Sequence, residues 1–120
     1  AASNLISTNE LGSLQDDPVD QWEQRFAPVR ERLPFVRGVI GYISDSDVPG
    51  ADFDAANDEG EYILTQYALA PVVLVRGTDQ VWNVANLTRD SFERWQSIHP
   101  SGFELVWQQN GLYLLHRTDP

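Results

Sequence analysis

The chain alternates between segments with the apolar period of a helix and short β-branched segments, and this alternation limits the folds open to it. Apolar side chains recur at helical spacing in three segments: 18–33, 62–70 and 88–98. Strand-like runs occupy five others: 36–43, 72–75, 81–87, 103–108 and 112–117. Strands separated by helices require at least one parallel crossover. The order predicts a single small α/β domain with a mixed, mostly parallel sheet, covering helices and a C-terminal β-hairpin.

The first helix and the last turn carry clear local signals. Asp17 can cap a helix whose first residue is Pro18, because proline lacks the N–H group that this position leaves unpaired. Pro28 lies inside the same pattern and predicts a kink or two short helices. Between the last two strands, Asn110-Gly111 is the sequence that a tight hairpin turn favours.

The length of 120 residues suits one compact domain. Residues 1–16 show no sustained periodicity, so they are interpreted as a linker or tail, and residues 17–118 as the α/β domain. The sequence has no apolar run of roughly 18 residues, the length that a membrane-spanning helix needs.

Composition excludes several classes of function. The formal net charge of -10 would repel phosphates, so a nucleic-acid partner is not expected. The chain contains no cysteine, which excludes thiol nucleophiles, disulfides and zinc-thiolate sites. His99 and His116 have no neighbour pattern typical of a catalytic base, and Ser44 and Ser101 lie in no nucleophile elbow. We assign no catalytic residue, and enzyme activity is not the favoured interpretation.

An acidic segment, 44–60, follows the strand at 36–43 and predicts a long loop at a place where open α/β sheets often bind ligands. A solvated acidic loop is one interpretation. The other is a site for Ca²⁺ or another divalent metal, since hard cations take carboxylate ligands, although the EF-hand pattern is not met. The candidate metal ligands are Asp45, Asp47, Asp52, Asp54 and Asp58.

Two features raise the alternative of sugar binding. Asp45-Ser-Asp47 and Asp52-Phe-Asp54 both have the Asp-x-Asp pattern that nucleotide-sugar transferases use to hold a metal. The tryptophans, together with four tyrosines, would form a stacking platform if they shared an exposed face, and would otherwise pack in the core. They are Trp22, Trp82, Trp95 and Trp107.

Two stretches resemble a type of uncharacterised soluble segment found in the extracytoplasmic part of bacterial membrane proteins. They are Gly38-Val-Ile-Gly-Tyr42-Ile-Ser-Asp45, and Glu61 to Leu74 with its Tyr67-Ala-Leu-Ala-Pro71 motif. The resemblance covers about Val36 to Arg117 and transfers no catalytic residue. It implies a membrane anchor upstream of Ala1 and a domain outside the cytoplasm. It also implies that Tyr42 and Tyr67 are structural, with Tyr67 buried where the helix meets the sheet.

These observations lead to one leading expectation and one alternative. The leading expectation is a non-catalytic interaction or ligand-sensing domain of a membrane-anchored bacterial protein, with an unidentified protein or small molecule as its partner. The alternative is a divalent-metal or carbohydrate-binding accessory domain of a membrane protein that resembles glycosyltransferases. In both cases the membrane enters only through sequence upstream of this chain, and no cofactor other than a metal is expected.

Overall fold

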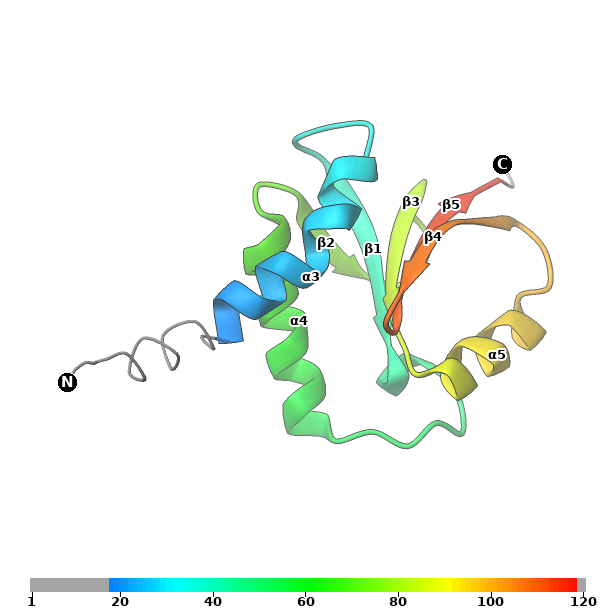
Figure 1. Ribbon diagram of the computed structural model, residues 1–120. Coiled ribbons are helices and arrows are strands. Elements are labelled where there is room, and N and C mark those ends of the chain that lie inside the picture. Colours follow the sequence, from blue (N-terminus) through cyan, green and yellow to red (C-terminus); the bar gives the residue numbers. More distant parts are fainter. Residues whose placement is uncertain (1–17, 119–120) are drawn as a thin grey trace.

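The computed structural model describes residues 18–118, which form one five-stranded mixed sheet with helices on both faces (Figure 1). The strands lie in the order β2-β1-β3-β5-β4. β1 is parallel to β2 and β3, whereas β5 is antiparallel to β3 and β4. The strands are β1 (Val39–Ser44), β2 (Val73–Arg76), β3 (Trp82–Asn86), β4 (Phe103–Gln109) and β5 (Leu112–Arg117). The predicted fold class, including the closing hairpin, is confirmed.

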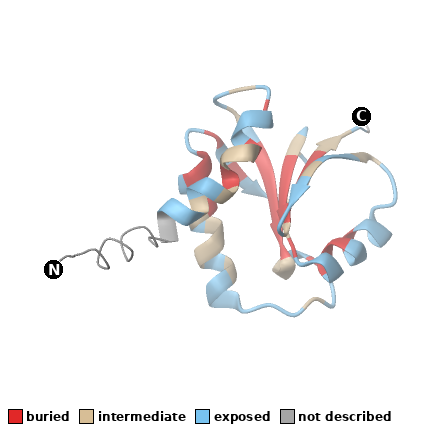
Figure 2. Cartoon of the chain, viewed as in Figure 1, coloured by how far each residue is buried: buried red, intermediate tan, exposed pale blue. Residues whose placement is uncertain are grey.

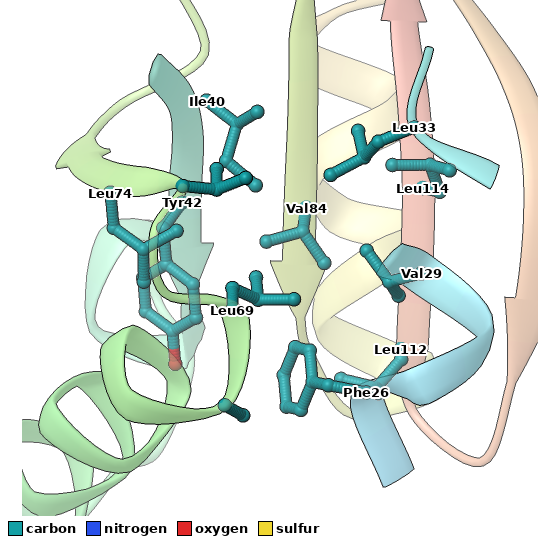
Figure 3. Close-up of a cluster of buried hydrophobic side chains, with 12 residues drawn as sticks. Phe26, Val29, Leu33, Ile40, Tyr42, Leu69, Leu74, Val84, Leu112 and Leu114 are labelled. Carbon is teal, nitrogen blue, oxygen red and sulfur yellow. The ribbon is translucent and has the colours of Figure 1, made fainter. Parts of the chain in front are cut away.

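Two helices, α3 (Pro18–Arg32) and α4 (Ala55–Leu69), cover one face of the sheet, and α5 (Arg89–Ile98) covers part of the other. Buried residues concentrate in the central strands between these layers (Figure 2). Figure 3 shows Phe26 and Val29 of α3, and Leu33 directly after it, beside the sheet residues of the first core. The second core packs Phe92 and Trp95 of α5 against the opposite face. The three central strands, β1, β3 and β5, therefore supply side chains to two separate cores.

The first helix runs without interruption through Pro28, so the prediction of two short helices is wrong. Proline removes one backbone hydrogen bond, but Phe26 and Val29 beside it are fully buried and hold this part of the helix against the sheet. Asp17 and the linker assigned to 1–16 lie outside the described residues. Among residues 18–118, no helix combines the length and the apolar character that a membrane span requires.

The acidic segment is shorter as a loop than the sequence suggested. Residues Asp45–Asp47 form a 3₁₀ helix (η1), and α4 already begins at Ala55. Asp54 caps α4, because its Oδ1 accepts the backbone N–H groups of Ala56 at 3.0 Å and Asn57 at 3.2 Å. The early start of α4 places residues 55–60 in the helix instead of the loop.

Tyr67 does not lie on the buried face of α4. Thr65, Ala68 and Leu69 are buried, whereas Tyr67 is 67% exposed and Ile63 is 51% exposed. The implied burial of Tyr67 is therefore wrong. On the inner side of α4, Thr65 accepts a hydrogen bond from Trp22 of α3, whereas Tyr67 lies on the outer side. Tyr42, in contrast, is fully buried in the first core.

Strand β2 forms one edge of the sheet, and α4 covers the polar groups of its outer side. The Gln66 side chain donates to the carbonyl of Val72 at 2.7 Å and accepts the N–H of Leu74 at 2.8 Å. The Tyr62 hydroxyl donates to the carbonyl of Leu74 at 3.1 Å. These side chains take the place of a neighbouring strand, so this edge is protected against pairing with another chain.

We expect Gln66→Leu to lower the free energy of unfolding by about 1 to 2 kcal/mol, because two edge hydrogen bonds are lost while the apolar volume is kept. It should also promote self-association, since the backbone groups of Val72 and Leu74 become available to another strand. Urea denaturation and sedimentation velocity measure the two effects. Gln108→Leu, an exposed residue of β4 with no side-chain hydrogen bond among residues 18–118, is the matched control. Equal behaviour of the two variants would contradict the edge-protecting role of Gln66.

The connection from β2 to β3 is unusually short. The two strands are parallel and lie on opposite sides of β1, yet only residues 77–81 join them. Such crossovers normally take about a dozen residues or more. The chain crosses directly over Gly41, where an added Cβ atom would lie 2.3 Å from the carbonyl oxygen of Gly77 and 2.0 Å from Asn83 Oδ1. Buried Asn83 braces the crossing by donating to the carbonyl of Gln80 at 2.8 Å.

The hairpin between β4 and β5 turns at the predicted residues. Asn110 has φ 49° and Gly111 has φ 83°, the left-handed backbone that an Asn-Gly turn allows. A register shift between Leu105 and Trp107 marks a bulge in β4. The turn brings Asn110 close to the ends of β1 and β3, where the candidate site lies.

Candidate functional site

A cleft of 390 Å³ lies where β1 and β3 end, at the lower end of the sheet in Figure 1. The N-terminal ends of α4 and α5 and the β4–β5 turn complete its walls. We call it the strand-end cleft and define it by five of its lining residues: Arg25, Asp45, Glu61, Asn86 and Asn110. Ligand sites of open α/β sheets occur at the carboxyl ends of parallel strands, which is the position of this cleft.

One wall of the cleft rests on an ion cluster that joins four elements. The Arg76 guanidinium, at the end of β2, donates to Asp58 Oδ2 at 3.0 Å and to Asp47 Oδ2 at 2.9 Å. It also donates to the Ser44 hydroxyl at 3.0 Å. Asp58 further accepts hydrogen bonds from Ser44 and from Ser46, the latter at 2.8 Å. The cluster therefore fixes the end of β1 to η1, α4 and β2.

The ion cluster holds Asp58 as a carboxylate. Burial alone would raise the pKa of Asp58, but hydrogen bonds from Ser44 and Ser46 and the Arg76 guanidinium outweigh it and hold the pKa below its usual value. A carboxylate with a lowered pKa is a weak base, so it does not activate the hydroxyl of Ser44. The arrangement is that of a structural cluster.

The structure places the five predicted metal ligands in separate roles. Asp45 Oδ1 accepts the N–H of Thr88, the residue that caps α5, at 3.1 Å. Asp47 and Asp58 pair with Arg76, and Asp54 caps α4. Asp52 is exposed and has no hydrogen bond or ion pair within residues 18–118. In that part of the chain, no three histidine or acidic side chains meet in a group suited to a metal ion. Metal binding by these residues stays a prediction.

Three carboxylates that line the cleft are each held by one oxygen only. Asp45 and Asp54 use Oδ1 for the helix ends, and Glu61 Oε1 accepts from the Asn86 amide at 2.7 Å. The second oxygen of each has no hydrogen-bond donor in the described part of the chain. The cleft thus presents fixed acceptors, and sequence reasoning missed Glu61 and Asn86.

Arg25 of α3 is the cationic residue among those that line the cleft. Its Nη2 donates to the carbonyl of Asn110 at 2.9 Å and lies 3.4 Å from Asn86 Oδ1. Its guanidinium also lies 4.8 Å from the ring centre of Trp22. Burial lowers the pKa of Arg25 despite the opposing effect of nearby Glu61. The guanidinium already has partners and ties α3 to the hairpin turn.

Asn86 also links the cleft to the core. Its amide donates to the hydroxyl of Tyr42 at 3.2 Å, in addition to Glu61. Burial, the largest cause, raises the pKa of Tyr42 to about 12, although the hydrogen bond from Asn86 opposes the shift. Tyr42 is therefore a neutral phenol at physiological pH and belongs to the scaffold of the site.

The tryptophans pack in the core and do not form an exposed platform. Trp95 is 5% exposed and belongs to the second core. Trp22, Trp82 and Trp107 are partly buried and pack against the first core. The aromatic residue of the cleft is instead Phe53, which is 52% exposed.

No protein-family model matches the chain, and no curated protein or solved structure matches it significantly. The geometry of the strand-end cleft is therefore the basis for the functional argument.

Proposed function

We propose that this protein is a non-catalytic ligand-binding domain and that the strand-end cleft holds a small polar molecule rich in hydrogen-bond donors. The observation that carries the proposal is the set of half-used carboxylates, Asp45, Asp54 and Glu61, around a cavity of 390 Å³. Acceptors fixed by the protein need no reordering when a ligand arrives, which favours binding. The volume falls in the range of about 300 to 1,000 Å³ typical of small-molecule sites.

A hydroxylated ligand such as a monosaccharide fits the chemistry of this cleft. Its hydroxyl groups would donate to the carboxylates, and the exposed ring of Phe53 would cover its apolar face. This extends the carbohydrate-binding expectation from the sequence to a defined place in the fold. Attachment to a membrane upstream of Ala1 and a position outside the cytoplasm are part of the same proposal and rest on the resemblance alone.

Thermal melting with a panel of monosaccharides, amino sugars and Ca²⁺ tests the proposal. A ligand at about 100 times its Kd should stabilise the domain by about 2.7 kcal/mol and raise the Tm. Asn57→Trp should abolish the rise, because Asn57 is exposed and lines the cleft. Ala55→Trp is the matched control, an exposed position two residues earlier in α4 that does not line the cleft.

Three outcomes are informative. A rise that Asn57→Trp removes and Ala55→Trp keeps supports binding in the cleft. A rise caused by Ca²⁺ alone, and removed by Asp52→Asn and Asp54→Asn, would favour the metal site instead. No rise with any member of the panel contradicts the proposed function.

A further inference from the structure

At both helix ends of the strand-end cleft, side chains of the protein accept some of the N–H groups that could bind an anion. Helix N-termini at the carboxyl ends of strands are common phosphate sites, because their N–H groups have no partner within the helix. Here Asp54 accepts the N–H groups of Ala56 and Asn57 at the start of α4. At the start of α5, Asp45 accepts the N–H of Thr88, whose hydroxyl accepts the N–H of Ser91. Four of the N–H donors at these two ends are therefore occupied, and carboxylates accept three of them.

The other charged side chains of the cleft also favour a cationic ligand over an anionic one. Asp45, Asp54 and Glu61 each keep one oxygen without a donor within residues 18–118, as described above. Arg25 Nη2 already donates to the carbonyl oxygen of Asn110 and to Asn86 Oδ1. Asp45, Asp54 and Glu61 bring three negative charges against the one positive charge of Arg25, so an anionic ligand would meet net negative charge, whereas a cation would reduce it.

We infer, on the basis of the proposed function, that the ligand of the strand-end cleft carries a protonated primary amine on a hydroxylated frame, as an amino sugar does. An ammonium group supplies three donors and a positive charge to a site that has acceptors and negative charge. The exposed Phe53 ring offers a surface to the apolar part of the ligand and attracts a nearby cation. The side chains of Asn57 and Asn110, which line the cleft, are suited to the hydroxyl groups.

Isothermal titration calorimetry with three matched probes tests the inference: glucosamine, glucose and glucose 6-phosphate. Glucosamine should bind about tenfold more tightly than glucose, because its ammonium makes charge-assisted hydrogen bonds. Glucose 6-phosphate should bind most weakly. The preference for glucosamine should fall as the pH is raised through the pKa of its amine.

Two variants remove one charge each from the cleft while keeping its shape. Glu61→Gln retains an oxygen that can accept from Asn86, and Asp54→Asn retains an equally good helix cap. Each should reduce the preference for glucosamine over glucose to threefold or less, because it removes one of the charged acceptors for the ammonium group. Glu59→Gln, with the same loss of charge at an exposed position of α4 outside the cleft, should leave the preference unchanged.

The results separate this inference from the proposed function. Equal binding of glucose and glucosamine, or tightest binding of glucose 6-phosphate, overturns the inference and leaves a ligand-binding cleft. Loss of the preference in Glu59→Gln as well would also overturn it, since the effect would then come from overall charge. Absence of binding by every sugar and amine tested contradicts both.

Discussion

Replacing Gly41 with alanine should lower the free energy of unfolding by about 3 kcal/mol, the largest effect expected of any single methyl group in this chain. The added carbon would lie 2.3 Å from the carbonyl oxygen of Gly77 and 2.0 Å from Asn83 Oδ1. The Gly77 carbonyl belongs to the backbone of the connection over β1. Because this connection is so short, it can move away from the added carbon only a little. Moving it would also disturb buried Asn83, whose amide holds the carbonyl of Gln80.

The control for this substitution is Gly60→Ala. Gly60 lies inside α4, and nothing is within 4 Å of the position that its Cβ would take. Alanine should therefore stabilise the domain by about 0.5 to 1 kcal/mol, because it restricts the unfolded chain. Urea denaturation followed by tryptophan fluorescence measures both variants. A loss below about 1 kcal/mol for Gly41→Ala would mean that the crossing can shift at little cost.

Asp58→Asn should lower the free energy of unfolding by about 2 to 3 kcal/mol at pH 7, because it removes charged hydrogen bonds from Arg76 and from two serines. The Asp58 side chain is 11% exposed, so water replaces little of what is lost. Arg76 is 38% exposed and keeps Asp47 as a partner, which keeps the effect below that of breaking a fully buried ion pair. Chemical denaturation at neutral pH gives the magnitude.

The natural chain and Asp58→Asn should also differ in how their free energy of unfolding changes at low pH. The pKa of Asp58 is lowered in the folded state, so its contribution is complete above the unfolded-state pKa and is lost as the pH falls through the folded-state value. The natural chain should therefore lose stability from about pH 5 downward, and the gap to Asp58→Asn should narrow over that range. Asp52→Asn, at an exposed position that has no ion pair or hydrogen bond among residues 18–118, should follow the natural chain. A gap independent of pH would contradict the ionic role of Asp58.

Local patterns in the sequence were sufficient to predict much of the fold. The stripe of Phe26, Val29 and Leu33, and the Asn110-Gly111 turn, depend on residues close in sequence. The burial of Tyr67 was predicted wrongly: Tyr67 is 67% exposed, whereas Tyr62 packs against the first core and donates a hydrogen bond to the β2 edge. The helix start at Ala55 was missed, although Asp54 before an alanine pair is a normal capping signal.

The candidate site was harder to predict because its parts are distant in sequence. Arg25, Glu61 and Asn86 come from α3, α4 and β3, and only the packing of the helices on the sheet brings them together. The acidic segment did indicate the end of the sheet at which the strand-end cleft lies. Arg76 is the first basic residue after that segment. Its position could have indicated that some acidic residues of the segment form ion pairs with it.

The hydrogen bonds of Gln66 and Tyr62 to β2 have a consequence for how copies of this chain can associate. A fibril that grows by strand pairing needs two open edges on every molecule, one to accept a neighbour and one to offer to the next. Here α4 closes one edge, and β4 forms the other. Two copies that paired through β4 would leave only closed β2 edges at both ends. Association through strand pairing therefore ends with a pair, so the sheet cannot serve as a unit of an open-ended polymer.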